Sequence, residues 1–368
     1  MFLAQRNLFK DKTRLALSIG GVALAVMLVL VLNGFLTGMY RQITSYLDHS
    51  PGSVVIAQRG VNNLLGATSL LPPDTADEAE KIDGVAGVAP ILSQFIILDL
   101  HGKKQPAYMV GYLPDAERGG GPWKIAEGRE PEADDEVVFD SVLAARHEIR
   151  LGGMIEIMGK DFAVVGLSEG TTSWMTSFFF IRKSAAESLL RAPGATSFLL
   201  VTPADGESPE SVRDRLDNLQ GAQAVLKSEM AANDYKLFAR YFSAPLQLMT
   251  GIAFLVGTLI VGLVIYTATV ERQREYGVLK AIGARNAVLY RVVAAQALIA
   301  AMAGAILGVG LAYAAGEWIM AARPQFLIVL EPVESARAVV IGLGMALAAA
   351  LFPARVVAGV APAEVFRK

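Results

Sequence analysis

The sequence contains no cysteine and only three histidines. Without cysteine, disulfide bonds and thiolate chemistry are excluded, and any exported part of the chain must be stabilised by its own core. The histidines, His49, His101 and His147, lie far apart in the sequence and lack metal-ligand spacing. No metal site is therefore expected.

Motifs for catalysis are missing as well. The run Gly119–Lys124 (GGGPWK) has a superficial likeness to a phosphate-binding loop, but it lacks the GxxxxGK(S/T) pattern and contains a proline. We interpret it as a surface turn, and the acidic run Glu130–Glu136 as a solvated loop. No serine lies in a nucleophile-elbow context. We therefore expect no catalytic residue, no cofactor bound by this chain and no enzyme activity of the chain by itself.

Charge is absent from four long segments. Hydrophobic residues make up 53% of the chain and charged residues only 18%, which is too apolar for an ordinary soluble domain. A helix needs roughly 20 apolar residues to cross a bilayer about 30 Å thick. The uncharged segments cover residues 15–40, 242–270, 292–316 and 338–354, the last at the lower limit of length. Buried helices of a soluble protein would explain one such segment but hardly four, so we predict four transmembrane helices.

The first of these segments is predicted to be an uncleaved anchor. Its apolar run is longer than the roughly 7–15 apolar residues of a signal peptide, and no clear small-residue cleavage site follows it.

The orientation of the chain follows from lysine and arginine in the short flanks. Residues 1–14 carry four basic residues against one acidic, residues 271–291 five against two, and residues 355–368 three against one. The loop 317–337 carries two basic and three acidic residues. Both termini and the segment between the second and third spans are therefore predicted to be cytoplasmic.

Residues 41–241 are then left outside as one large domain. Between Gln42 and Arg240 this domain carries 18 basic and 28 acidic residues, a net charge of −10. The basic residues of the rest of the chain lie in membrane flanks and not in one patch, so no nucleic-acid partner is expected.

Short runs rich in β-branched and aromatic residues alternate with helical patterns in this outer domain. Strands are predicted at residues 53–58, 95–100, 107–112, 136–139, 154–158, 162–167, 178–181 and 198–201, and helices at 74–82, 141–147, 185–190 and 209–219. Both ends of the domain show the order strand, helix, short strand, the last strand ending near Pro90 and near Leu226. This order predicts a split α+β sheet with the middle segment inserted, and helical stalks at residues 39–48 and 228–240.

The predicted spans are poor in functional groups. They contain no carboxylate and no arginine, which proton relays and ion pathways usually require, so a proton-coupled carrier or an ion channel is not expected. Gly304 and Gly308 form a GxxxG motif, which is typical of close helix packing, although the abundance of glycine in membrane helices explains it equally well. Because four spans enclose little, we expect a homodimer.

The segment Glu271–Ala284 (ERQREYGVLKAIGA) directly follows the second span. It is expected to turn at Gly277 and Gly283 and to offer a short charged surface to a cytoplasmic partner. The alternative is that its charges merely cap the span. Four charges lie within its first five residues: Glu271, Arg272, Arg274 and Glu275.

On these features the chain resembles the FtsX/MacB-type permeases of ABC transporters, the type VII or mechanotransmission class. The segment order matches over essentially the full length. Glu271–Ala284 is similar to the family's run ER-x-x-E-x-G-x-L-K-A-x-G-A, and the ending FPARVVAGVAPAEVFR is similar to its P-A-R…P-x-E-x-(L/F)-R close. MacB itself carries a fused ATPase domain, which this sequence lacks. The overall size and the stretch WKIAEGREPEADDEVVFDSVLA look closer to stand-alone permeases of the DevC and HrtB kind.

The resemblance implies a permease in the bacterial cytoplasmic (inner) membrane that works by mechanotransmission. In the family, the segment after the second span forms a coupling helix that docks on an ABC ATPase, here expected as a separate subunit that uses ATP and magnesium. The other expected partners are a second copy of this chain, membrane lipids and an extracytoplasmic adaptor. The residues that match the motif are Glu271, Arg272, Glu275, Gly277, Lys280 and Gly283.

Three functions stay open at this point. The first is export of a hydrophobic or amphipathic substrate such as a haem, a glycolipid or a toxic amphiphile, and it is favoured because the uncharged spans suit entry from the bilayer. The second is extraction of lipids or lipoproteins towards a periplasmic acceptor. The third is activation of an extracytoplasmic hydrolase without transport. Candidate substrate-binding residues are Met27, Asn33, Met39 and Tyr40, although ordinary packing also explains them.

The expected architecture is an α-helical membrane protein with four transmembrane helices and a large α+β extracytoplasmic domain inserted between the first and second. Its segments are a cytoplasmic amphipathic start (1–14), the first span (15–40), the outer domain with stalks (41–241), the second span (242–270), the coupling segment (271–291), the third span (292–316), an extracytoplasmic loop (317–337), the fourth span (338–354) and a cytoplasmic tail (355–368).

Overall fold

A computed structural model of the chain describes residues 12–114, 119–173, 176–271, 274, 277–278, 281–283 and 285–359. The chain divides into two compact units. The outer unit comprises Met39–Tyr241 together with Pro324–Leu327, and the helical unit comprises the remaining residues.

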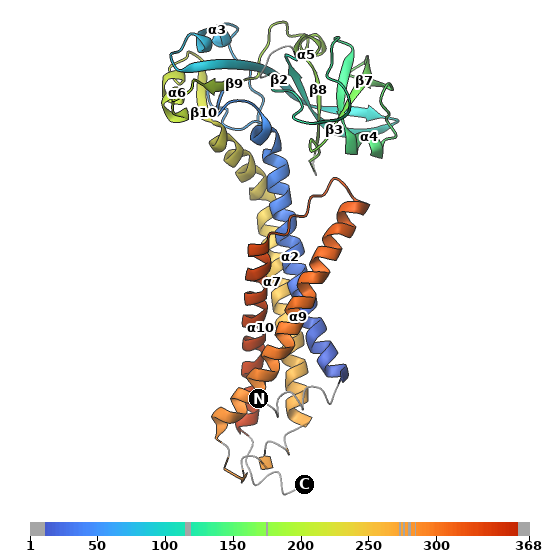
Figure 1. Cartoon of the computed structure of the whole chain (residues 1–368), viewed down its shortest axis with the longest axis vertical. Helices are drawn as coiled ribbons and strands as arrows, with labels where there is room; N and C mark the ends of the chain where they lie inside the picture. The colour runs from blue at the N-terminus through green and yellow to red at the C-terminus, as the bar shows by residue number, and fades with distance from the viewer. Residues whose placement is uncertain are drawn as a thin grey trace. The chain divides into compact units, whose positions relative to one another are not determined.

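Four helices in the described residues are long and apolar enough to cross a membrane. They are α2 (Lys12–His49), α7 (Lys227–Glu271), α9 (Asn286–Ala322) and α10 (Pro332–Gly359) (Figure 1). Each contributes apolar side chains to one common core, including Val22, Val261, Val293 and Met345. A large domain lies between the first and second of these helices in the sequence, as predicted.

The two segments predicted to form stalks are helical in the structure. Residues 39–48 form the last part of α2, and residues 228–240 form the first part of α7. With 45 residues, α7 is about 68 Å long, roughly twice the thickness of the hydrocarbon core. Only its uncharged part, residues 242–270, therefore suits the bilayer.

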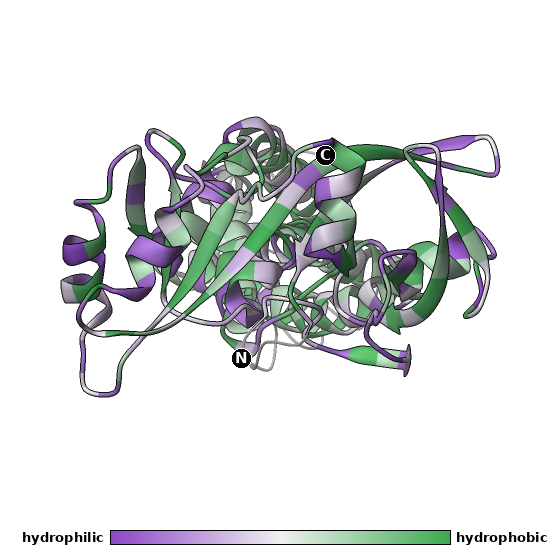
Figure 2. Ribbon diagram, turned by 90° about the horizontal axis from the view of Figure 1, so that it is seen from above, coloured by the Kyte–Doolittle hydropathy of each residue, from purple (hydrophilic) through white to green (hydrophobic). Residues whose placement is uncertain are grey.

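The described residues of the outer unit contain a ten-stranded sheet and four short helices. The strands carry mainly hydrophobic residues, whereas the turns between them are hydrophilic (Figure 2). The strands are β1 (Val54–Gln58), β2 (Val85–Leu100), β3 (Lys103–Tyr112), β4 (Ile125–Gly128), β5 (Glu136–Asp140), β6 (Met154–Ile157), β7 (Lys160–Ser168), β8 (Ser177–Arg182), β9 (Phe198–Pro203) and β10 (Ala222–Leu226). The helices are α3 (Thr75–Glu80), α4 (Ser141–Arg146), α5 (Lys183–Leu190) and α6 (Pro209–Leu216).

One end of the sheet has the strand order β10-β1-β9-β2, with every neighbouring pair antiparallel. The segments β1-α3-β2 and β9-α6-β10 are two β-α-β units, each with a strand of the other unit inserted between its own two strands. This confirms the predicted split arrangement. Ala79 of α3 and Val212 and Leu216 of α6 are buried in the core on this part of the sheet.

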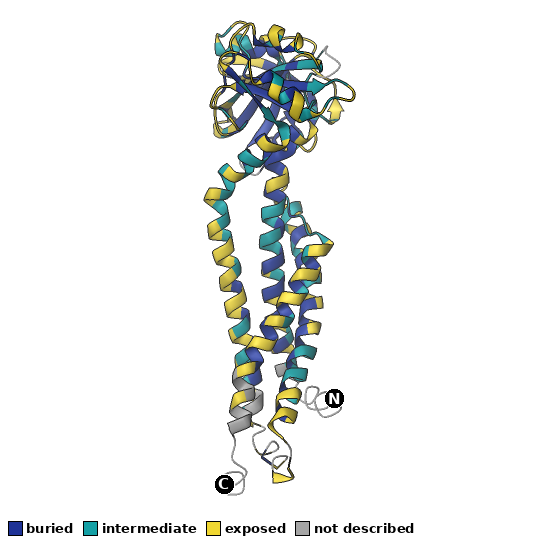
Figure 3. Ribbon diagram, turned by 90° about the vertical axis from the view of Figure 1, so that its left-hand side faces the viewer, coloured by how far each residue is buried: buried dark blue, intermediate teal, exposed yellow. Residues whose placement is uncertain are grey.

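The inserted segment, residues 92–197, forms the other end of the sheet, in the order β2-β3-β8-β5-β7-β4, with β6 paired to β7. Here β3 runs parallel to β8, and β5 runs parallel to β7. Many residues of the sheet in the outer unit are buried (Figure 3). Phe178, Phe179 and Phe180 are at most 1% exposed, so the strand predicted at residues 178–181 is present and buried.

The structure corrects several details of the prediction in this unit. The expected strands ending near Pro90 and starting at Phe95 are one strand, β2, which pairs with β9 before Leu92 and with β3 from Leu92 onwards. Strand β4 was not predicted. The expected surface turn at Gly119–Lys124 is partly buried, because the backbone of Gly120 contacts the hydroxyl of Tyr46 and that of Gly121 lies against the ring of Tyr112.

The interpretation of Glu130–Glu136 as a solvated loop is also wrong at one end. Glu136 starts β5, and its carboxylate lies 2.6 Å from the guanidinium of Arg129. The hydrogen bond from Arg129 lowers the pKa of Glu136 to about 2.

Candidate functional site

The charged segment that follows α7 is described only in part. Glu271 and Arg274 are exposed, whereas Arg272, Glu275 and Lys280 lie outside the described residues. Gly283 has φ of +98°, a conformation that glycine adopts readily, and α9 begins three residues later. The turn predicted at Gly277 is wrong, because Gly277 is helical and buried. One glycine inside a helix costs only about 1 kcal/mol relative to alanine, so the helical conformation is tolerated.

Two apolar residues in this segment were missed by the sequence analysis. The side chains of Val278 and Ile282 are 42% and 80% exposed. The backbone N–H of Ile282 donates to the carbonyl oxygen of Val278 at 3.1 Å, so the two residues lie one helical turn apart on the same face. Their spacing of four residues in the sequence is the signal that could have identified them.

The GxxxG motif of α9 lies against α2 of the same chain. A Cβ atom at Gly304 would lie 2.7 Å from the carbonyl oxygen of Ile19, and one at Gly308 would lie 2.6 Å from that of Ala23. Such distances are shorter than van der Waals contact, so the two helix backbones approach as closely as they do only because both residues are glycine. Gly310, two residues on, has no neighbouring atom within 4 Å of a Cβ position.

An apolar groove lies between α2 and α7 within the helical unit. Its volume is about 330 Å³, and none of its lining residues is charged. The lining residues are Gly21, Leu24, Ala25, Leu28 and Leu32 of α2, and Met249, Ile252, Ala253, Val256, Gly257 and Ile260 of α7.

The structure does not bring the four candidate substrate-binding residues together. Met27 packs against the core of the helical unit, and Asn33 is half-buried in the same unit. Met39 is only 1% exposed, and Tyr40 contacts Tyr235 edge-to-face at 4.8 Å between ring centroids. Because Met27 and Met39 are separated by about 18 Å along one helix, they cannot ligate one metal atom. None of the four lines the groove.

The end of α2 is anchored in the outer unit by Tyr46. Its hydroxyl donates to the carbonyl oxygen of Gly120 at 2.7 Å, and its ring stacks on Phe178 at 5.6 Å between centroids. Burial raises the pKa of Tyr46, so the hydroxyl stays protonated and acts as a donor. One turn further on, His49 stacks on Trp123 at 4.8 Å.

Comparison with known protein families gives two matches that together cover most of the chain. Residues 15–219 match the MacB-like periplasmic core domain, and residues 248–362 match the FtsX-like permease C-terminal domain. The chain belongs to the MacB/FtsX family of ABC transporter permeases. The four apolar helices in the described part of this permease agree with a multi-pass protein of the inner membrane.

Relatives of the permease carry compatible names. An uncharacterised ABC transporter permease of Mycobacterium tuberculosis is 27% identical over 317 residues, which are 85% of each chain. A putative hemin transport system permease protein HrtB of Staphylococcus haemolyticus is 20% identical over 302 residues, which are 82% of this permease and 81% of the relative.

Among solved structures, the periplasmic region of MacB from Actinobacillus actinomycetemcomitans is similar to part of the permease. It is 14% identical and covers 50% of this chain and 92% of its own, with a TM-score of 0.36.

Proposed function

We propose that the permease couples ATP hydrolysis by a separate ABC ATPase subunit to the export or extrusion of a hydrophobic or amphipathic substrate by mechanotransmission. The observation that carries this proposal is the continuity of α2 and α7. Each helix runs without interruption from an uncharged segment into the outer unit, and no flexible linker intervenes. A continuous helix transmits displacement of one end to the other, which a glycine-serine tether does not.

The chemistry of the membrane segments supports an apolar cargo. The spans carry no charged side chain, and the groove between α2 and α7 is lined only by apolar residues and glycine. Such a surface offers no polar partner to an ion or a sugar. The tail or flat ring of an amphiphile, by contrast, loses little free energy when it moves there from lipid. The name of the HrtB relative adds haem to the substrates worth testing first.

The proposed assembly contains two copies of the permease and two copies of the ATPase. Both termini and the segment after α7 face the cytoplasm, where Glu271, Arg274 and the exposed apolar pair Val278 and Ile282 meet the ATPase. Arg272, Glu275, Lys280 and Gly283 complete this proposed coupling surface, and the buried Gly277 belongs to the same proposed coupling segment. An extracytoplasmic adaptor would bind the outer unit, and membrane lipids would surround the helices.

The test is the ATPase activity of the permease co-purified with its ATPase in lipid nanodiscs. The activity is titrated with haem, lipids, drugs and lipopeptides in turn. We expect one amphipathic class to stimulate the activity several-fold. Stimulation by lipopeptides alone would favour lipoprotein extraction, and a flat response of an intact complex would contradict transport and favour activation of an extracytoplasmic partner.

A substitution in the groove tests whether this groove is needed for the stimulation. Ala253→Trp fills the groove between α2 and α7 and should abolish the stimulation. Leu263→Trp makes a similar change at an exposed position of the same helix outside the groove, and it should leave the stimulation unchanged.

A further inference from the structure

Asp234 is a fully buried carboxylate in the part of α7 that belongs to the outer unit. It lies eight residues before Phe242, where the uncharged span begins, and is therefore outside the membrane-spanning segment. Its side chain is 0% exposed. Nothing in the proposed transport cycle requires a carboxylate here, and burying an ionised one is costly.

The two carboxylate oxygens of Asp234 hold the segment 61–66, which follows β1. Leu65 donates its backbone N–H to Oδ1 at 2.8 Å, and Leu64 donates its own to Oδ2 at 3.1 Å. Next to them, the side chain of Asn233 donates to the carbonyl oxygen of Asn62 at 3.0 Å. Three hydrogen bonds thus join this segment to two consecutive residues of α7: Asp234 accepts two of them and Asn233 donates the third.

The same segment is tied to the sheet. The hydroxyl of Tyr108 on β3 lies 2.9 Å from the carbonyl oxygen of Leu64, and the side chain of Gln223 donates to the carbonyl oxygen of Val61 at 2.8 Å. Segment 61–66 therefore links α7 to strands β3 and β10, and Asp234 supplies the carboxyl group in that link.

We propose that Asp234 is a proton-controlled latch between α7 and segment 61–66, closed while its carboxyl group is protonated and weakened when the group ionises. A protonated carboxyl keeps an acceptor lone pair on each oxygen, so both backbone hydrogen bonds persist in the closed state. An ionised carboxylate is stabilised by water, which it reaches only when the segment opens. In one respect this inference rests on the proposed function: the latch would set how much of a displacement of α7 is transmitted to the outer unit.

The electrostatic surroundings of Asp234 agree with this assignment. Burial raises its pKa to about 7, and the hydrogen bonds from Leu64 and Leu65 only partly oppose that increase. Among the described residues, the facing titratable group is Tyr108, whose own pKa is raised by burial, so it stays neutral. The segment contributes the uncharged residues Asn62, Asn63, Leu64 and Leu65.

The sign of the pH dependence follows from linkage. The closed latch has a carboxyl pKa of about 7, whereas an open, hydrated aspartate has one of about 3.9. The closed state therefore binds the proton more strongly, and low pH favours it. Between these two values the opening equilibrium constant should rise about tenfold per pH unit, and above about pH 7 it should level off.

Hydrogen–deuterium exchange of the full-length permease in nanodiscs tests the latch. Exchange of peptides covering residues 61–66 is measured from about pH 4.5 to pH 6.5 and normalised to unprotected amides. In the wild type, the normalised rate should rise about tenfold per pH unit. A flat profile in the wild-type protein, which needs no variant to fold, would overturn the proposal.

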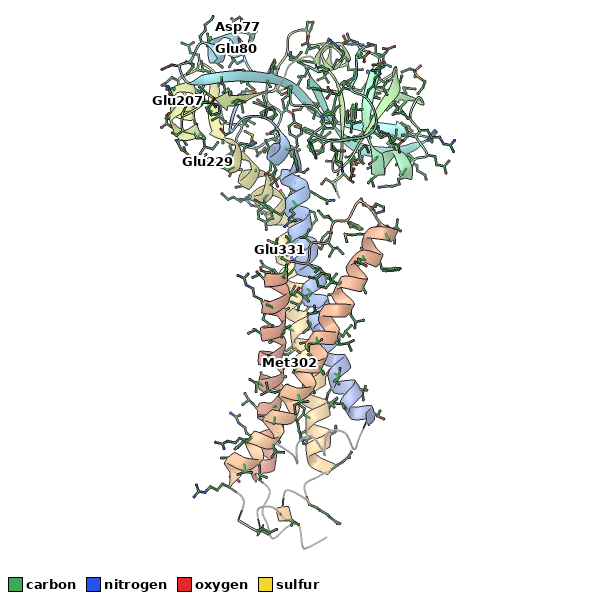
Figure 4. The ribbon with its side chains drawn as sticks, in the orientation of Figure 1. Asp77, Glu80, Glu207, Glu229, Met302 and Glu331 are labelled. Carbon is green, nitrogen blue, oxygen red and sulfur yellow. The ribbon has the colours of Figure 1, made fainter. Side chains whose placement is uncertain are left out.

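Two variants assign the effect to this carboxyl group. Asp234→Asn cannot ionise and should show no pH dependence in the same peptides; a wild-type slope in this variant would also overturn the proposal. Glu229→Gln removes an exposed acid of the same helix (Figure 4) and should keep the wild-type slope. Because no ATPase or substrate takes part, failure of the latch is distinguishable from failure of the proposed function.

Discussion

Tyr46 shows how a single side chain fixes α2 in the outer unit. Its hydroxyl is fully buried and donates to Gly120, 74 residues away in the sequence. Tyr46→Phe keeps the ring packing but leaves that buried carbonyl oxygen without its donor. We expect a loss of about 1–2 kcal/mol of folding free energy, which for a domain of this size lowers the melting temperature by roughly 2–8 °C.

Thermal unfolding of the full-length protein measures this loss. Tyr40→Phe, on the same helix, removes a hydroxyl from a ring that is 41% exposed and should change the melting temperature much less. Equal effects of the two substitutions would show that the hydrogen bond to Gly120 contributes little.

The sequence alone could not predict these residue-level contacts. Asp234 bonds to Leu64 across 170 residues, and its neighbours in the sequence, Asn233 and Lys236, make it look like part of a solvated stalk. Burial of a carboxylate depends on the tertiary fold, which no local pattern encodes. Gly304 and Gly308 were predictable because close packing of membrane helices selects small residues at a fixed local spacing.

At the scale of helices, the contact between α9 and α2 leads to a matched pair of substitutions. Gly308→Ala places a methyl group against the backbone of Ala23, which cannot move without shifting α2. We expect a destabilisation of about 1–3 kcal/mol from overpacking. Gly310→Ala meets open space and should be neutral or slightly stabilising, since alanine favours the helix.

The melting temperatures of the two variants in nanodiscs check this expectation. A lower value for the Gly308 variant alone supports the contact. If both variants matched the wild type, the two helices would not be packed at Gly308 as described.

Most elements of the outer unit were predictable because their hydrophobic patterns are local. Strands β1, β5 and β8, for example, begin within one residue of the predicted positions. Strand β2 was divided in the prediction because Gly87 and Pro90 normally interrupt a strand pattern. In the structure this strand changes partners at Leu92, so one long strand joins the two halves of the sheet. This change of pairing partner depends on the other strands of the sheet, so it cannot be read from the sequence of β2 itself.

At the scale of the whole molecule, the membrane class and the family were predictable, but the substrate was not. Hydropathy is sufficient to find the membrane spans, because each uncharged run prefers lipid to water by its own composition. The charges in the flanks are likewise read directly from the sequence. Substrate choice depends on side chains that several helices bring together, and the four residues proposed from the sequence lie apart. The groove between α2 and α7 combines residues about 230 positions apart, which only the fold brings together.

Coupling to the ATPase is the property that requires the whole assembly. The double substitution Glu271→Lys with Glu275→Lys reverses two charges of the proposed coupling segment and should reduce ATPase co-purification at least tenfold, because like charges now face a surface that had bound carboxylates. Membrane insertion should be unchanged, since both residues follow the span.

Glu317→Lys is the control. It reverses an exposed charge near the C-terminal end of α9, on the side predicted to be extracytoplasmic, and should leave association intact. Normal association of the double variant would contradict a role for these carboxylates, and docking would then rest on the exposed apolar pair Val278 and Ile282.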